Sequence, residues 1–176
     1  MNPREPHDSP PALTREELAQ LGATLRARGL RVVTAESCTG GGIAVALSEL
    51  PGSSAWLEAG FVTYSNAAKQ SLLAVPAAVL RRYGAVSEAV VCAMTAGALA
   101  RTEANLAVAV SGIAGPAGGT PEKPVGTVCL AWQQRGQAAR ALTCHFPGGR
   151  EAVRAAAVRR ALEGLVVSPS SPGLAL

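Results

Sequence analysis

Strand-like and helix-like segments alternate along most of this 176-residue chain, and this alternation limits the possible folds more than any other feature. Apolar runs typical of strands occupy residues 31–37, 60–66 and 105–112, with helical patterns between them. Two further runs, 125–132 and 139–146, flank a short polar turn and favour an antiparallel hairpin. Strands separated by helices predict an α/β domain, a three-layer α/β/α sandwich with a mostly parallel, mixed sheet.

The helix boundaries follow from capping signals and apolar spacing. Thr14 and Glu17 form a capping-box pattern ahead of apolar residues at helical spacing, which predicts a first helix ending near Gly29. Further helices are predicted at 43–50, 67–73, 87–102 and 150–165. Residues 1–12 and 167–176 are rich in proline and serine, so both are predicted to be flexible tails around a folded domain at 13–166.

Composition excludes several classes of protein. No apolar run reaches the ~20 residues that span a bilayer, and the first residues lack a signal-peptide pattern, so we expect a cytoplasmic protein without a membrane partner. The net charge of +4 comes from dispersed arginines with few aromatic residues, which argues against a nucleic-acid partner. Four scattered cysteines and two histidines, His7 and His145, form no metal-binding pattern. We therefore expect reduced thiols, no metal and no cofactor.

The basic residues are unevenly divided between lysine and arginine. Of sixteen basic residues, only Lys69 and Lys123 are lysines. An amine can lose its proton at tolerable cost, whereas a guanidinium cannot. This difference singles out Lys69 as a candidate for proton transfer.

Polar side chains follow three of the predicted strands. The segments are 36–42, 63–66 and 111–115, and each includes the last residues of a predicted strand. Ligands of open α/β sheets bind beyond the carboxyl ends of the strands. The three segments are therefore expected to converge on one crevice.

The first segment holds Ser37, Thr39 and the glycines 40–42 at a strand-to-helix junction. Unpaired amides at a helix N-terminus favour an anion, such as a phosphate or a developing oxyanion. The loop lacks the Lys-Ser/Thr of a Walker A motif and the third glycine of a dinucleotide-binding motif. The alternative is an ordinary tight turn in which Ser37 or Thr39 caps the helix.

A nucleophilic Ser37 requires a base, because a free hydroxyl is a weak nucleophile at neutral pH. Neither histidine is well placed along the sequence, so a Ser-Lys pair with Lys69 is favoured over a Ser-His-Asp triad. Such a lysine needs burial to lower its pKa from about 10.4. Tyr64 is a candidate to relay a proton or to hold the lysine, and Cys38 is a rival nucleophile. Taken singly, Lys69 also suits a solvated helix position and Tyr64 a packed strand position.

Two further segments offer groups for a polar ligand. The turn after the third strand, with Ser111, Gly112 and Gly115, carries backbone donors and a hydroxyl, although it also suits a simple turn. Arg150 follows a Pro-Gly-Gly turn at the start of the last helix, where it can pair with a phosphate or lie on the surface.

Several separate motifs together resemble one known family. AESCTGG, VTYSNAAKQSLL, GAVSE, SGIAGPAGGTPEKPVGTV and FPGGR occur in the order seen in the competence/damage-inducible CinA C-terminal family. The resemblance runs from about residue 14 to residue 165. It implies an α/β/α sandwich that forms homo-oligomers and, without a metal, hydrolyses the carboxamide of nicotinamide mononucleotide to nicotinate mononucleotide and ammonia. Longer members carry an additional N-terminal molybdopterin-binding-like domain, so this chain resembles the stand-alone form.

The resemblance also assigns roles to residues. It implies that Ser37 is the nucleophile, that Tyr64 and Lys69 support it, and that Ser111 and Arg150 help to hold the substrate. Substrate contacts are further expected from the first two motifs and the glycine turn: Thr39, Gly40, Gly41, Gly42, Asn66, Gly112 and Gly115. Two positions depart from the family pattern. Ser111 replaces a threonine but keeps the hydroxyl, and Gly149 replaces a common acidic residue next to Arg150.

The sequence thus predicts an amidohydrolase of the Ser-Lys type that recycles a pyridine nucleotide. Two alternatives stay open. One is a nucleotide- or partner-binding module without turnover, and the other is an amidase for a different nucleotide-like amide.

Overall fold

The computed structural model describes residues 13–166, which fold into one sheet with helices on both faces. The strands are β1 Val32–Glu36, β2 Leu57–Val62, β3 Leu106–Gly112, β4 Thr127–Gln134 and β5 Arg140–His145. The helices are α1 Arg15–Ala27, α2 Gly42–Ser48, α3 Asn66–Leu73, α4 Ala77–Tyr83, α5 Glu88–Ala100 and α6 Arg150–Glu163, with a short 3₁₀ turn, η1, at Ser53–Ala55.

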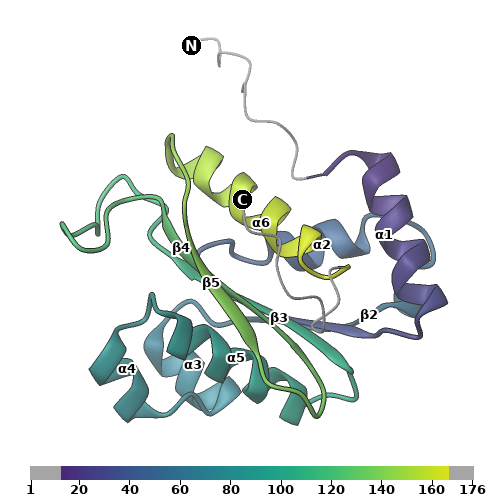
Figure 1. Cartoon of the computed structure of the whole chain (residues 1–176), viewed down its shortest axis with the longest axis horizontal. Helices are drawn as coiled ribbons and strands as arrows, with labels where there is room; N and C mark the ends of the chain where they lie inside the picture. Colours follow the sequence, from purple (N-terminus) through teal and green to yellow (C-terminus); the bar gives the residue numbers. More distant parts are fainter. Residues whose placement is uncertain (1–12, 167–176) are drawn as a thin grey trace.

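The sheet has the strand order β2-β1-β3-β4-β5. β1 pairs in parallel with both β2 and β3, β4 runs antiparallel to β3, and β5 runs antiparallel to β4. Four strands therefore point in one direction, and the predicted mostly parallel, mixed sheet is confirmed. In Figure 1, α1, α2 and α6 cover one face of the sheet while α3, α4 and α5 cover the other, which gives the predicted three layers.

Two apolar cores lie on the two faces of the central strands. β1 and β3 are buried along almost their whole length, so neighbouring residues alternate between the cores. Val32 and Val108 pack toward α1, α2 and α6, whereas Val33 and Ala107 pack toward α3, α4 and α5. Central strands of this kind are apolar on both faces because helices cover both.

The predicted elements agree with the structure in type, with two differences. The capping box of Thr14 and Glu17 is present at the start of α1. The strand predicted at 60–66 ends earlier, at Val62, because pairing with β1 stops there and Ser65 then caps α3. The helix α4 was missed, since it is only seven residues long and follows a proline without a side-chain cap. The two predicted tails lie outside the described residues.

None of the helices within residues 13–166 combines the length and the apolar character that crossing a bilayer requires.

The contact between α3 and α5 depends on Gly97. A Cβ atom built on Gly97 would lie 1.9 Å from the carbonyl oxygen of Leu73, a backbone atom that cannot move aside easily. Gly97 is therefore the residue that allows α5 to approach the end of α3.

We predict that Gly97→Ala lowers the free energy of unfolding by about 1–3 kcal/mol, the usual range for overpacking. Helix propensity alone predicts the opposite sign, a gain of about 1 kcal/mol. Urea unfolding measures the difference. Ala96→Gly, at an exposed position of the same helix, calibrates the propensity contribution. A Gly97→Ala protein more stable than the wild type contradicts the close helix contact.

Candidate active site

A pocket of about 200 Å³ lies where β1, β2 and β3 end. Its lining combines the nucleophile and base candidates with small apolar side chains, and most of it comes from the three segments that were expected to converge. The lining residues are Ser37, Cys38, Tyr64, Asn66, Lys69, Ala85, Val86, Ser111, Gly112, Ala114 and Arg150. The structure thus brings together Ser37, Tyr64, Asn66, Lys69, Ser111, Gly112 and Arg150 from the sequence-based candidates.

Lys69 reaches the pocket from the second turn of α3. Its Nζ lies 3.0 Å from Ser37 Oγ, 2.9 Å from the carbonyl oxygen of Thr63 and 3.4 Å from that of Tyr64. A neutral amine has two N–H donors and one lone pair. The two carbonyls can accept the two donors, which leaves the lone pair for the Ser37 hydroxyl. The geometry therefore suits an uncharged lysine as well as an ammonium.

The environment of Lys69 favours the uncharged form. The side chain is only 1% exposed, and burial lowers the pKa of its amine below the ordinary value. Within residues 13–166, Lys69 has no ion pair with a carboxylate that could reverse this shift. A lysine of this kind can serve as a general base, because its neutral form is accessible nearer to neutral pH.

The turn that carries Ser37 is organised by a buried carboxylate, Glu36. One Glu36 oxygen accepts hydrogen bonds from the Thr39 hydroxyl at 2.6 Å and the Ile43 amide at 3.0 Å, and the other accepts one from the Ala44 amide at 2.9 Å. Glu36 thus occupies the N-terminus of α2, where the helix dipole favours an anion. The anion predicted at this helix end is therefore supplied by the protein itself.

Hydrogen bonds within the turn decide which of its backbone amides can donate to a bound substrate. Gly40 and Gly42 donate to carbonyls of their own turn, and Gly41, with a φ of 96°, precedes the first residue of α2. By contrast, the amide of Thr39 has no hydrogen-bond acceptor within the described part of the chain, and the amide of Cys38 meets its own thiol. These two amides directly follow Ser37 in the sequence, and of the two residues Cys38 lines the pocket.

Cys38, the rival nucleophile, is buried next to Ser37. Burial raises the pKa of its thiol to about 11, so very little thiolate exists near neutral pH. Because the thiolate is the reactive form, this environment disfavours Cys38 and favours Ser37 as the nucleophile.

Tyr64 and Arg150 meet at the rim of the pocket. The Arg150 guanidinium donates to the Tyr64 hydroxyl at 2.9 Å and to the carbonyl oxygen of Gly115 at 3.0 Å. Tyr64 is 59% exposed, and it contacts Lys69 through its backbone carbonyl rather than through its phenol. The structure thus places the Tyr64 phenol beside Arg150 in the pocket lining, and the proton relay suggested by sequence stays a prediction.

Five of the predicted substrate contacts are not among the described residues that line the pocket, and their roles stay predictions: Thr39, Gly40, Gly41, Gly42 and Gly115. The Thr39 hydroxyl is engaged by Glu36, and the Thr39 carbonyl accepts a hydrogen bond from Arg154 of α6 at 2.9 Å. The Ser111 hydroxyl faces the lining but donates to the carbonyl oxygen of Ala85 at 2.8 Å. The hydroxyls of Thr39 and Ser111 are therefore both engaged within the protein.

Sequence reasoning assigned no role to Glu36, Arg154 or the apolar pair Ala85 and Val86. For Glu36 a signal existed. A charged residue at the end of an apolar strand, followed by a glycine turn and a helix, matches the need of helix N-terminal amides for an acceptor. Nothing in the local sequence marks the contact between Arg154 and the Thr39 carbonyl, which joins residues 115 positions apart.

No group of three or more His, Cys, Asp or Glu side chains among residues 13–166 is arranged to hold a metal ion. Within this part of the chain, the side chains that line the pocket offer two hydroxyls, a thiol, a carboxamide, an amine, a guanidinium, a phenol and small apolar groups.

Curated relatives with high identity cover most of the chain. It is 56% identical over 149 residues to the nicotinamide-nucleotide amidohydrolase PncC of Pseudomonas putida, a match covering 84% of this chain and 91% of that protein. It is 51% identical over 158 residues to PncC of Escherichia coli K12, covering 87% and 95%. A CinA-like protein of Akkermansia muciniphila is 55% identical over 142 residues, but the match spans only 34% of its length.

Solved structures with the same fold are also similar in sequence. The competence/damage-inducible protein CihA of Agrobacterium tumefaciens superposes with a TM-score of 0.81 at 46% identity, covering 88% of this chain and 96% of that one. A CinA superfamily protein of Escherichia coli superposes with a TM-score of 0.83 at 39% identity, covering 94% and 98%. Residues 15–168 match the CinA C-terminal domain family. With this match and these relatives, the chain belongs to the CinA C-terminal domain family.

Proposed function

We propose that this protein hydrolyses the carboxamide of nicotinamide mononucleotide, releasing nicotinate mononucleotide and ammonia, with Ser37 as nucleophile and Lys69 as base. One observation carries the proposal: a buried lysine amine with a lowered pKa lies 3.0 Å from a serine hydroxyl inside a pocket. The names of the Pseudomonas putida and Escherichia coli relatives, nicotinamide-nucleotide amidohydrolase, support the substrate class.

The first half of the reaction transfers the acyl group to the enzyme. Neutral Lys69 accepts the Ser37 proton as Oγ attacks the carboxamide carbon, and a tetrahedral intermediate forms. The amide of Cys38, a residue that lines the pocket next to Ser37, is our candidate to stabilise its oxyanion, a contribution worth ~10²–10³ in rate for one donor. The Lys69 ammonium then returns the proton to the departing nitrogen, the C–N bond breaks, and ammonia leaves an ester on Ser37.

The second half restores the enzyme. Water attacks the ester carbon, Lys69 accepts a proton from that water, and the proton passes to Ser37 Oγ as the C–O bond breaks. Nicotinate mononucleotide leaves as the carboxylate, and the remaining proton of the attacking water is released to solvent. The same amine thus acts as base and acid in both halves, which requires a pKa that allows both forms.

The shape of the pocket suits a nucleotide whose ring alone is buried. Its volume of about 200 Å³ is below the ~300–1,000 Å³ of typical ligand sites. We place the pyridine ring and carboxamide inside, between Ser37 and the apolar wall of Ala85 and Val86. The ribose phosphate then crosses the rim to Arg150, whose planar guanidinium can pair with phosphate in bidentate fashion. The homo-oligomer expected from the family resemblance stays a prediction.

Ser37→Ala is predicted to lower kcat for ammonia release from nicotinamide mononucleotide by about 10⁴-fold or more, because the attacking oxygen is lost while the turn is kept. Ammonia is assayed with this substrate and with a panel of other carboxamides. Cys38→Ala, at the neighbouring buried position, is the matched comparison and should lower kcat far less. If Ser37→Ala keeps about a tenth of the activity or more, the nucleophile is another group.

The wild-type kcat is predicted to rise with pH through the lowered pKa of Lys69 and to level off above it. The sign follows from the chemistry, because only the neutral amine accepts the Ser37 proton and its fraction grows with pH. Initial rates at saturating substrate across the pH range provide the measurement.

Lys69→Arg supplies the control for this pH profile. It keeps a cation at the position but cannot lose its proton, so kcat should fall by ~10²–10⁴ and the remaining rate should lose the rise. Equilibrium binding of nicotinamide mononucleotide to the variant shows whether the pocket survives. Near wild-type turnover by Lys69→Arg contradicts the role of Lys69 as base.

A further inference from the structure

The segment between α4 and α5 forms one wall of the pocket. It runs from Tyr83, the last residue of α4, to Ser87, the N-cap of α5, and it contributes Ala85 and Val86 to the lining. These side chains supply apolar surface next to the polar pair of Ser37 and Lys69. A wall without regular secondary structure requires other contacts to stay in place.

Lys123, the second of the two lysines, holds this segment at both ends. Its Nζ donates to the carbonyl oxygen of Tyr83 at 2.9 Å and to that of Val86 at 2.7 Å. Both bonds are assisted by the charge of the amine, and such bonds are shorter and stronger than neutral ones. The Tyr83 carbonyl also lies at the C-terminal end of α4, where the helix dipole favours a cation.

Side chains bind the two carbonyls between these ends as well. Ser87 Oγ donates to the carbonyl oxygen of Gly84 at 2.9 Å, and Ser111 Oγ donates to that of Ala85 at 2.8 Å. Four successive carbonyls, from residue 83 to residue 86, therefore each accept a side-chain hydrogen bond. Two of these four bonds come from Lys123, which lies in the connection between β3 and β4.

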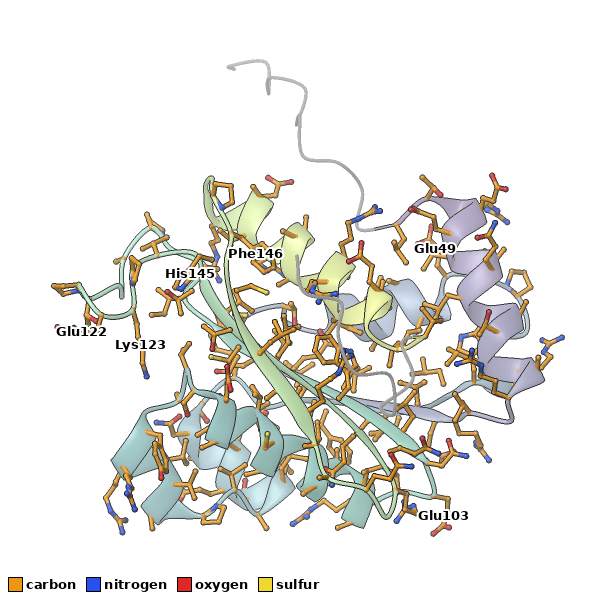
Figure 2. The ribbon with its side chains drawn as sticks, viewed as in Figure 1. Glu49, Glu103, Glu122, Lys123, His145 and Phe146 are labelled. Atoms are coloured by element: carbon orange, nitrogen blue, oxygen red, sulfur yellow. The ribbon has the colours of Figure 1, made fainter. Side chains whose placement is uncertain are left out.

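The β3–β4 connection presents Lys123 to the wall through its own local turn. The amide of Thr120 donates to the carbonyl of Lys123 at 2.9 Å, and the amide of Lys123 donates to Thr120 Oγ at 3.1 Å. Figure 2 shows the Lys123 side chain extending from the connection toward the helices below, while Glu122 lies at its outer tip. Lys123 is not among the described residues that line the pocket, so replacing it removes no side chain from the lining.

We propose that Lys123 is a positioning residue that holds the Ala85–Val86 wall against the pocket and so sets the affinity for the substrate ring. The inference rests on the proposed function, since that function supplies the ring. Lys123 acts through the wall and not on the reacting atoms. Its loss therefore weakens binding while leaving the chemistry of Ser37 and Lys69 in place.

The test is Lys123→Met, which keeps the length of the side chain but removes the donors. We expect KM for nicotinamide mononucleotide to rise about tenfold, equivalent to ~1.4 kcal/mol, while kcat stays within about threefold of the wild type. Lys123→Arg retains donors and charge and should restore KM to within about threefold of the wild type. Glu122→Gln, at the adjacent exposed position, is the matched control and should leave both parameters unchanged.

Hydrogen exchange provides a second readout that needs no substrate. Amides in the peptide covering residues 83–88 should exchange several-fold faster in Lys123→Met than in the wild type, and Lys123→Arg should reverse the effect. This measurement tests the wall even if the protein does not act on nicotinamide mononucleotide. A failed ammonia assay in the wild type therefore contradicts the proposed function, and unchanged exchange in Lys123→Met contradicts this inference.

A purely stabilising role for Lys123 gives a different result. In that case Lys123→Met lowers the thermal midpoint but leaves KM and the exchange of residues 83–88 as in the wild type. A fall in kcat with unchanged KM also overturns the inference, because it assigns Lys123 to the chemical step.

Discussion

The burial of an amine without a carboxylate partner is the constraint on which the rest of this site depends. Lys69 is almost fully enclosed, and its Nζ hydrogen-bonds with one hydroxyl and two carbonyl oxygens of the described residues. Enclosure disfavours the ammonium and lowers the pKa of the amine, and no carboxylate within residues 13–166 forms an ion pair with Lys69 that would oppose this effect. A lysine that would be an inert cation in water thus becomes a group that can exchange a proton with Ser37.

The sheet and its connections supply this environment from several distant segments. β1 ends at Glu36, whose carboxylate holds the N-terminus of α2 and thereby the turn that carries Ser37. The short segment between β2 and α3 presents the carbonyls of Thr63 and Tyr64 to the Lys69 amine. The Glu36 carboxylate accepts hydrogen bonds from amides of the α2 N-terminus. Among the described residues, it forms no ion pair with Lys69.

The sequence predicted the parts of this account that depend on local pattern. The alternation of strands and helices is enough to place Ser37, Tyr64 and Ser111 at one edge of a sheet, and the scarcity of lysine singled out Lys69. Contacts between remote side chains and backbone atoms were beyond such reasoning. The phenol of Tyr64 meets Arg150, the Ser111 hydroxyl binds the Ala85 carbonyl, and Lys123 reaches Tyr83 and Val86, because tertiary packing decides where long side chains end.

The protonation of Lys69 in the free enzyme tests the account most directly. The chain has only two lysines, so lysine labelled with ¹³C at Cε gives two side-chain signals, and Lys69→Arg identifies the signal of Lys69 by its loss. We predict that this signal titrates with a midpoint clearly below about 10.4, the ordinary lysine pKa. The midpoint should coincide with the rise of kcat with pH. A midpoint at or above about 10.4 means that Lys69 stays an ammonium under working conditions, and it contradicts the account.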